Sequence, residues 1–171
     1  MAHKETIALI GATTTTGQQL VPSLLALPCL LLLMDGSTES LHALYDTLPA
    51  GNNLATVDLL SCSREASWEA DIILIAGNEA NLEAIAAKIE EVATGKLILF
   101  ITTDESNRNS LQQWLPFSPV VTVLARNEGE ANAPFSIAIM ESNARDTLQK
   151  ADAFFKRLGV AETGIEPTVS I

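Results

Sequence analysis

The sequence contains few of the residues on which several kinds of catalytic and metal site depend. Among 171 residues there are one tyrosine, two histidines and two cysteines. Cys29 and Cys62 lack the paired spacing of a metal-binding motif, so we expect two free, buried thiols in a reducing compartment and no metal site. A tyrosine acid–base mechanism needs a lysine one helical turn later, and the residue at that distance from Tyr45 is Pro49. This absence excludes that mechanism.

Positive charge is also scarce. Ten Lys and Arg residues face 21 Asp and Glu, which gives a net charge of −11 and a pI near 4.5. Such a chain repels nucleic acid and anionic membranes, so we expect neither as a partner. The long apolar stretch 20–34 is interrupted by Pro22, Ser23 and Pro28 and is too short to span a bilayer. The N-terminus does not resemble a signal peptide, and we expect a cytoplasmic protein.

Apolar runs alternate along the chain with helical patterns. This alternation, with near-continuously apolar strands, predicts a doubly wound α/β fold of Rossmann type with a mostly parallel sheet, as a single three-layer domain over residues 1–171. We expect strands over 6–10, 30–34, 54–57, 71–76, 96–102, 120–124, 135–140 and 160–165, and helices over 17–27, 38–48, 64–69, 79–94 and 143–158.

The first turn carries the clearest functional signal. A strand-like run ends at Gly11, a polar turn follows, and Gly17 opens a helical pattern. Glycine permits a tight bend and the approach of a pyrophosphate, and the helix start offers amide groups and a positive dipole end to an anion. In the place of the usual middle glycine stands Thr14, whose side chain either narrows that approach or donates its hydroxyl to the phosphates. A dinucleotide site is the prediction, and a Rossmann scaffold with a degenerate pocket is the alternative.

Further candidates stand at the ends of later strands. Asp35 follows the second apolar run, where a carboxylate accepts hydrogen bonds from the adenosine ribose. The ends of the fourth and fifth strands are the expected walls of a nicotinamide pocket, with Thr103 and, more weakly, Asn127 beside them. The predicted cofactor-binding residues are Gly11, Ala12, Thr13, Thr14, Thr15, Thr16, Gly17, Asp35, Ser37, Ala76, Gly77, Asn78 and Thr102.

The same region bears on the choice of cofactor, NAD or NADP. After the second strand the chain continues as Asp35-Gly36-Ser37, with no arginine nearby to pair with a 2′-phosphate. Asp35 therefore favours NAD slightly, although Ser37 and Thr38 can bind a phosphate weakly.

Several segments resemble a known family. The chain resembles the deazaflavin-dependent NADP reductases and the N-terminal domain of pyrroline-5-carboxylate reductases. The resemblance lies in the order of the elements and in short motifs within segments 70–76, 94–102, 114–124 and 134–159. The turn 11–17 looks more like the Gly-Ala-Thr-Gly form of atypical short-chain dehydrogenases. The resemblance implies an NAD(P)-binding Rossmann domain in which hydride passes between a nicotinamide and a flavin or deazaflavin. The chain departs from the family after its fourth strand, where Gly77 and Asn78 replace Val-Pro.

No side chain stands out as a catalytic acid or base. His3 and His42 are expected on the solvated surface, and the loop with Arg126, Glu128 and Glu130 is expected to be a solvated charge cluster. Catalytic residues therefore stay unassigned, and whether the protein is an enzyme stays open. The alternatives are an oxidoreductase-like dinucleotide-binding protein, a non-catalytic interaction module, and a binder of a nucleotide-sugar or another adenosine phosphate. A homodimer through a free sheet edge is compatible with each.

Overall fold

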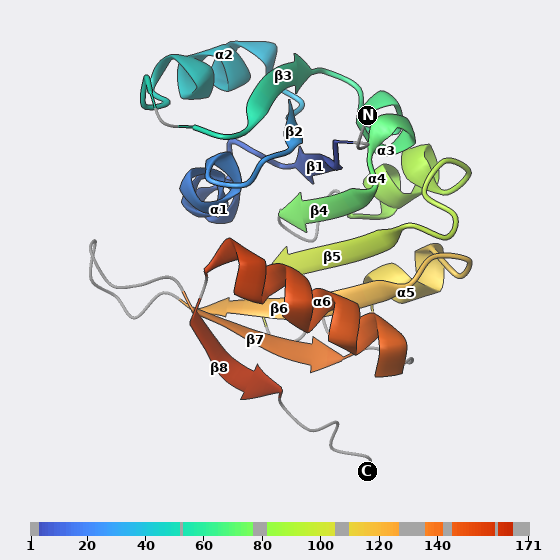
Figure 1. Cartoon of the computed structure of the whole chain (residues 1–171). Coiled ribbons are helices and arrows are strands. Elements are labelled where there is room, and N and C mark those ends of the chain that lie inside the picture. Colours follow the sequence, from blue (N-terminus) through green and yellow to red (C-terminus); the bar gives the residue numbers. More distant parts are fainter. Residues whose placement is uncertain are drawn as a thin grey trace.

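The structure is a computed structural model that describes residues 4–51, 53–76, 82–104, 110–126, 136–141, 145–159 and 161–165. Strands and helices alternate along most of the chain, as the hydrophobic pattern predicts (Figure 1). The strands are β1 (Thr6–Ile10), β2 (Leu30–Met34), β3 (Thr56–Leu60), β4 (Ile72–Ala76), β5 (Leu97–Thr102), β6 (Val120–Arg126), β7 (Ser136–Glu141) and β8 (Ala161–Ile165). The helices are α1 (Thr15–Leu25), α2 (Thr38–Asp46), α3 (Ser63–Glu69), α4 (Leu82–Ile89), α5 (Ser110–Trp114) and α6 (Arg145–Leu158).

The described strands form one eight-stranded sheet in the order β3-β2-β1-β4-β5-β6-β7-β8. The first six are parallel to one another, β7 runs antiparallel to β6, and β8 runs parallel to β7. The order of the six parallel strands is that of a doubly wound Rossmann sheet. The chain reverses its direction of travel across the sheet between β1 and β4, and ligands of such sheets bind outside the carboxyl ends of the strands at this point.

Helices cover both faces of the sheet. One hydrophobic cluster joins α1, α2 and α6 to one face, and a second joins α3, α4 and α5 to the other. The central strands are buried on both faces, with all five residues of β1 inside. This double burial accounts for the continuous apolar runs, because no side of such a strand faces water. The predicted three-layer α/β fold with a mostly parallel sheet is confirmed.

The main differences from the predicted elements lie in loops and helix ends. The third strand occupies Thr56–Leu60 instead of 54–57, and α1 begins at Thr15 instead of residue 17. The short helix α5 was not predicted. Helix α4 ends at Ile89 instead of residue 94, and residues 79–81 at its predicted start lie outside the described residues. Short amphipathic segments are hard to predict because packing, not propensity, stabilises them.

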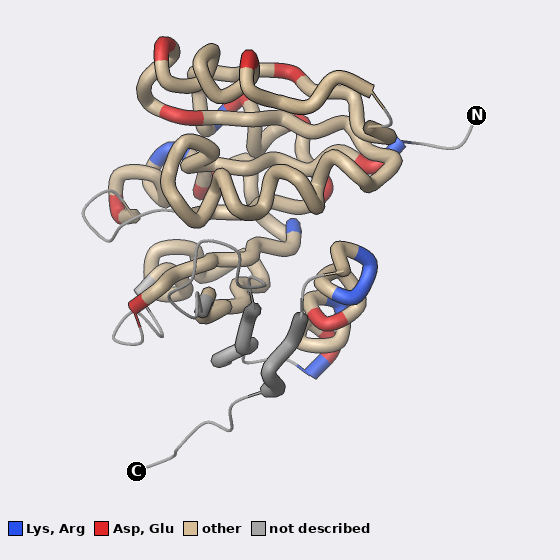
Figure 2. Tube along the Cα trace, turned by 90° about the vertical axis from the view of Figure 1, so that its left-hand side faces the viewer, with Lys and Arg blue, Asp and Glu red and all other residues tan. Residues whose placement is uncertain are grey.

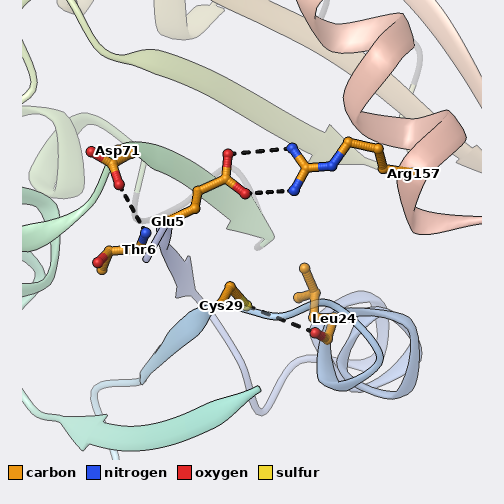
Figure 3. A network of polar contacts seen from close by, with 6 residues as sticks. All are labelled: Glu5, Thr6, Leu24, Cys29, Asp71 and Arg157. Carbon is orange, nitrogen blue, oxygen red and sulfur yellow. Dashed lines mark hydrogen bonds and ion pairs between the residues drawn. The ribbon is translucent and has the colours of Figure 1, made fainter. Parts of the chain in front are cut away.

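A polar network at the amino ends of β1 and β4 connects the residue before β1 with helix α6 (Figure 3). The carboxylate of Glu5 pairs with both terminal nitrogens of Arg157 on α6, at 2.6 and 3.3 Å. The carboxylate of Asp71, the residue before β4, accepts a hydrogen bond from the Thr6 amide at 2.8 Å. This bond joins the amino ends of β1 and β4. Local sequence does not predict these contacts, because Glu5 and Arg157 stand at opposite ends of the chain.

The two cysteines differ in their surroundings. Both are free thiols; Cys29 is buried as predicted, but the prediction is wrong for Cys62, which is exposed. Cys62 directly precedes α3 at the surface end of the β3–α3 connection, whereas Cys29 lies in the core beside α1 (Figure 3). Burial, with a smaller contribution from the charge of Glu5, raises the pKa of the Cys29 thiol.

None of the helices among the described residues is long and apolar enough to cross a membrane.

Two neighbouring phenylalanines attach α6 to the sheet. Phe154 and Phe155 lie in the first core cluster with ring centroids 5.5 Å apart in an edge-to-face arrangement. Phe155 is fully buried, whereas Phe117 is 72% exposed. We predict that Phe155→Ala lowers the free energy of unfolding by about 3–5 kcal/mol, because it removes buried area and leaves a cavity. The same truncation at Phe117 should change it by less than about 0.5 kcal/mol. Urea denaturation of both variants checks this, and equal losses would contradict the packing described here.

Candidate functional site

A groove opens at the carboxyl ends of β1, β2 and β4, where the sheet reverses its winding. It encloses a cavity of about 370 Å³ between the first turn and helix α4. Five separate stretches of sequence meet here: the end of β1 with its turn, the end of β2, the start of α3, the end of β4, and α4. The residues that line the cavity are Ile10, Gly11, Thr14, Met34, Asp35, Gly36, Ser63, Ala76, Ala84, Ile85 and Lys88. The structure thus brings Gly11, Thr14, Asp35 and Ala76, four of the predicted residues, to one cavity.

Position 11 requires glycine for two reasons, its backbone conformation and the closeness of a neighbouring strand. Its φ is +84°, a conformation that favours glycine. A Cβ placed on Gly11 would lie 1.6 Å from the carbonyl oxygen of Ala76 at the end of β4. The turn therefore passes directly against β4, and a side chain here would push the two apart.

Gly17 is required for a second close approach. A Cβ on this residue would lie 2.2 Å from the Gly11 carbonyl oxygen and 2.9 Å from that of Ala12. The first turn of α1 thus rests on the backbone of the residues that precede it. This contact sets the position of the helix start relative to the sheet. The two glycines of the predicted motif consequently act through backbone packing.

Thr14 is the N-cap of α1. Its hydroxyl donates to the Gly11 carbonyl oxygen at 2.7 Å and accepts the Gly17 amide at 3.0 Å. Its donor is therefore engaged within the turn, which argues against one of the two alternatives left open by the sequence, donation of this hydroxyl to the phosphates. Capping the first turn satisfies one of the amides that a helix start leaves without a partner. The residue at the middle-glycine position thus stabilises the helix start.

Two amides of the helix start have no acceptor among the described residues. Gly11 and Ala12 donate their amides to the Met34 carbonyl oxygen at 2.9 and 3.1 Å, which closes the turn onto β2. By contrast, no described group accepts the amides of Thr15 and Thr16, the first two residues of α1. These two donors, at the positive end of the helix dipole, are the ones an anion can use.

Asp35 is held by the turn across from it. Its Oδ2 atom accepts the Thr13 hydroxyl at 2.6 Å and the Thr13 amide at 3.1 Å. Its other oxygen, Oδ1, accepts the Ser37 amide at a longer 3.3 Å. The Ser37 hydroxyl caps helix α2 through the Ser40 amide at 3.2 Å. The carboxylate is therefore fixed at the edge of the cavity.

Sequence reasoning missed the contribution of α4. Ala84, Ile85 and Lys88 line the same cavity as Asp35, although they lie some fifty residues further along the chain. Ile85 and Lys88 are three residues apart and so share one side of the helix. That spacing was visible in the sequence, but the sequence did not show that this side of α4 faces the end of β2.

The other predicted residues do not line this cavity. Thr102 is buried at the end of β5, where its hydroxyl accepts the Asp104 amide at 3.1 Å. Gly77, Asn78 and Asn127 lie outside the described residues. Ala12, Thr13, Thr15, Thr16, Gly17 and Ser37 stand in the turn or at helix starts beside the cavity. The described residues also hold no group of three or more side chains suited to a metal ion.

A second cavity, of about 440 Å³, lies at the opposite ends of β4 and β5 beside α6. Two of its cations are engaged by the protein itself. The ammonium of Lys96 donates to two carbonyl oxygens at the end of α3, at 2.6 and 2.7 Å, and Arg157 pairs with Glu5. Burial lowers the pKa of Lys96, while the hydrogen bond to Glu5 raises that of Arg157. These contacts hold elements of the fold together.

Comparison with known proteins supports the fold and only the fold. No protein-family model and no curated protein sequence matches the chain. Many solved structures share its architecture. They include a pyrroline-5-carboxylate reductase from Coxiella burnetii (TM-score 0.73, 15% identity, 97% of this chain and 60% of that one). They also include a 3-hydroxyacyl-CoA dehydrogenase from Archaeoglobus fulgidus (TM-score 0.74, 18% identity, 96% and 58%).

A third such structure is the Plasmodium falciparum pyrroline carboxylate reductase with NADP bound (TM-score 0.65, 14% identity, 95% of this chain and 58% of that one). The chain spans about three fifths of the length of these proteins. The predicted resemblance to the Rossmann domain of such oxidoreductases is confirmed at the level of fold. The deazaflavin detail stays a prediction.

The glycine contacts give a matched test. We predict that Gly17→Ala destabilises the protein by about 1–3 kcal/mol, because the added methyl group overlaps the Gly11 carbonyl and forces α1 to shift. Gly36→Ala is the control, since no atom lies within 4 Å of a Cβ at Gly36. It should change stability by less than about 0.5 kcal/mol. Thermal or urea unfolding of both variants is the measurement, and a Gly17→Ala variant as stable as the parent would refute the close packing.

Proposed function

We propose that the groove binds a nicotinamide dinucleotide and that the protein is an oxidoreductase-like NAD(P)-binding protein. The observation that carries this proposal is the presence of three features at or beside one cavity at the reversal point of the sheet. These features are the glycine turn after β1, the uncapped amides at the start of α1, and a fixed carboxylate at the end of β2. Solved structures of this fold include proteins described as dependent on NAD+ or bound to NADP.

The pyrophosphate belongs at the start of α1. The amides of Thr15 and Thr16 lack an acceptor among the described residues, and the helix dipole favours negative charge there. Because the Thr14 hydroxyl donates to the Gly11 carbonyl oxygen, the phosphates are held by backbone amides in this proposal. The adenosine then extends toward Met34, Gly36 and Ile85, which give the cavity its apolar part.

Charge supports this placement. The protein carries a net charge of −11, so an anionic ligand needs a local source of positive charge. Four of the ten basic residues (Arg145, Lys150, Lys156 and Arg157) lie on α6, and a group of blue segments on one helix is visible in Figure 2. Among the described residues that line the groove, Lys88 is the one that carries a positive charge. We therefore propose that it offsets the charge of the bound phosphates.

Asp35 favours NAD over NADP in this proposal. A carboxylate at the end of β2 accepts a ribose hydroxyl and repels a 2′-phosphate. Its place on the cavity wall is the one that this role needs. The lysine in the same cavity reduces the repulsion, so we propose a preference and not an absolute choice.

Hydride transfer between the nicotinamide and a flavin or deazaflavin is the chemistry we propose. Such a reaction belongs mainly to the two cofactors, and the protein needs chiefly to position two rings. It makes no demand for the acid–base residues that the sequence lacks. A non-catalytic dinucleotide-binding module is the second candidate, favoured by the inward-turned hydroxyl of Thr14 at the middle-glycine position.

Titration with NADH and NADPH, followed by nicotinamide fluorescence, tests the proposal. We predict saturable binding of NADH, and Lys88→Glu should weaken it about fivefold or more. A charge of the wrong sign near an anion costs on the order of 1 kcal/mol even where water screens it. Lys150→Glu is the matched control, because it makes the same charge change at the second cavity. Absence of binding of either dinucleotide would remove the proposal, and equal effects of the two variants would remove the assigned groove.

Turnover separates the two candidate functions. We predict that the protein oxidises NADH in the presence of a flavin or deazaflavin acceptor, and that Gly11→Ala abolishes this activity by displacing the turn from β4. Binding without turnover on any such acceptor would favour the non-catalytic module.

A further inference from the structure

Thr13 donates two hydrogen bonds, one from its hydroxyl and one from its amide, to Asp35 at the edge of the groove. Its hydroxyl lies 2.6 Å from Asp35 Oδ2 and its amide 3.1 Å from the same atom. Hydrogen bonds to an ionised carboxylate are among the strongest in proteins, and the hydroxyl bond has the short length typical of that class. Two donors from one residue, 22 positions away in the sequence, therefore grip one oxygen of Asp35.

The two carboxylate oxygens of Asp35 therefore have different hydrogen-bond partners. A carboxylate offers about four acceptor positions, two on each oxygen. On Oδ2 both are taken by Thr13, while Oδ1 accepts only the longer 3.3 Å bond from the Ser37 amide among the contacts of the described residues. Oδ1 is accordingly the oxygen with capacity left for a ligand. The carboxylate can accept a ribose hydroxyl without giving up its hold on the turn.

The four consecutive threonines 13–16 do not share one role. The hydroxyl of Thr14 caps α1, whereas that of Thr13 is directed across the groove at Asp35. Every residue except proline supplies the backbone amide, but only a hydroxyl-bearing residue supplies the second, shorter bond. The choice of threonine at position 13 thus affects where the negative charge of Asp35 stands.

We propose that Thr13 is a positioning residue that fixes the Asp35 carboxylate and thereby sets the protein's discrimination between dinucleotides with a free adenosine 2′-hydroxyl and those with a 2′-phosphate. This inference rests on the proposed dinucleotide site. A fixed charge beside the ribose cannot swing away to admit a phosphate, whereas an unfixed side chain can rotate toward solvent. The hydroxyl of Thr13 therefore contributes to selectivity without touching the ligand.

The test measures the ratio of the dissociation constants for NADPH and NADH by nicotinamide fluorescence. The test variant is Thr13→Val, which keeps the shape of the side chain and removes its donor; Thr13→Ala is a second donor-free variant if valine disturbs folding. Thr13→Ser restores the hydroxyl. The control is Thr47→Val, which removes a hydroxyl bonded to the Leu44 carbonyl oxygen at the end of α2.

We expect the wild-type protein to prefer NADH, and Thr13→Val and Thr13→Ala to lower the ratio about fivefold or more, as for loss of a hydrogen bond to a charged group. Thr13→Ser and Thr47→Val should stay within about twofold of wild type. In an Asp35→Asn background the valine substitution should have no further effect on the ratio, because the charge to be positioned is gone.

The outcomes separate two failures. If the wild-type protein binds neither dinucleotide, the proposed function fails and the inference falls with it. If it binds NADH but the donor-free variants keep the wild-type ratio, or serine fails to restore it, only the inference is overturned. A wild-type preference for NADPH also overturns it.

Discussion

The site depends above all on the contact between the Gly11 backbone and the Ala76 carbonyl at the end of β4. The contact leaves no room for a Cβ, so the first turn stands at the point where β1 separates β2 from β4. Because Gly17 rests in turn on the Gly11 carbonyl, the start of α1 is positioned by the same backbone. The groove is thus a consequence of strand order, and the start of α1 stands beside it because two glycines allow close packing.

On this frame each polar side chain of the turn has a separate task. Thr14 closes the helix start, Thr13 holds Asp35, and the next two amides are left without a described acceptor. In the proposed site, contacts within the protein therefore hold the carboxylate and the helix start in place. Such preorganisation lowers the cost of binding, because the protein groups are not ordered at that moment. At the opposite ends of the strands, the ion pair of Glu5 with Arg157 connects the residue before β1 to α6.

The fold was largely predictable from the sequence, because β1, β4 and β5 are apolar on both faces and few folds besides a helix-covered parallel sheet produce such strands. The glycine turn and Asp35 were predictable for the same local reason, since each stands at a strand end. The position of Lys88 was not predictable, because it depends on how α4 packs. Local residue spacing alone does not determine which side of a helix faces the groove. Nor was the inward hydroxyl of Thr14 predictable, because capping and ligand donation demand the same residue type at the same position. The exposed Cys62 and the short helix α5 depend likewise on tertiary packing.

The central claim is that the start of α1 seats the phosphates of a dinucleotide. Its most direct test is an NMR titration of isotope-labelled protein with NAD+, following the backbone amides individually. We predict that the amides of Thr15 and Thr16 shift progressively and to saturation, while that of Lys96, at the far end of the sheet, stays in place. Saturating shifts confined to the amino ends of the strands, or none at the start of α1, would contradict it.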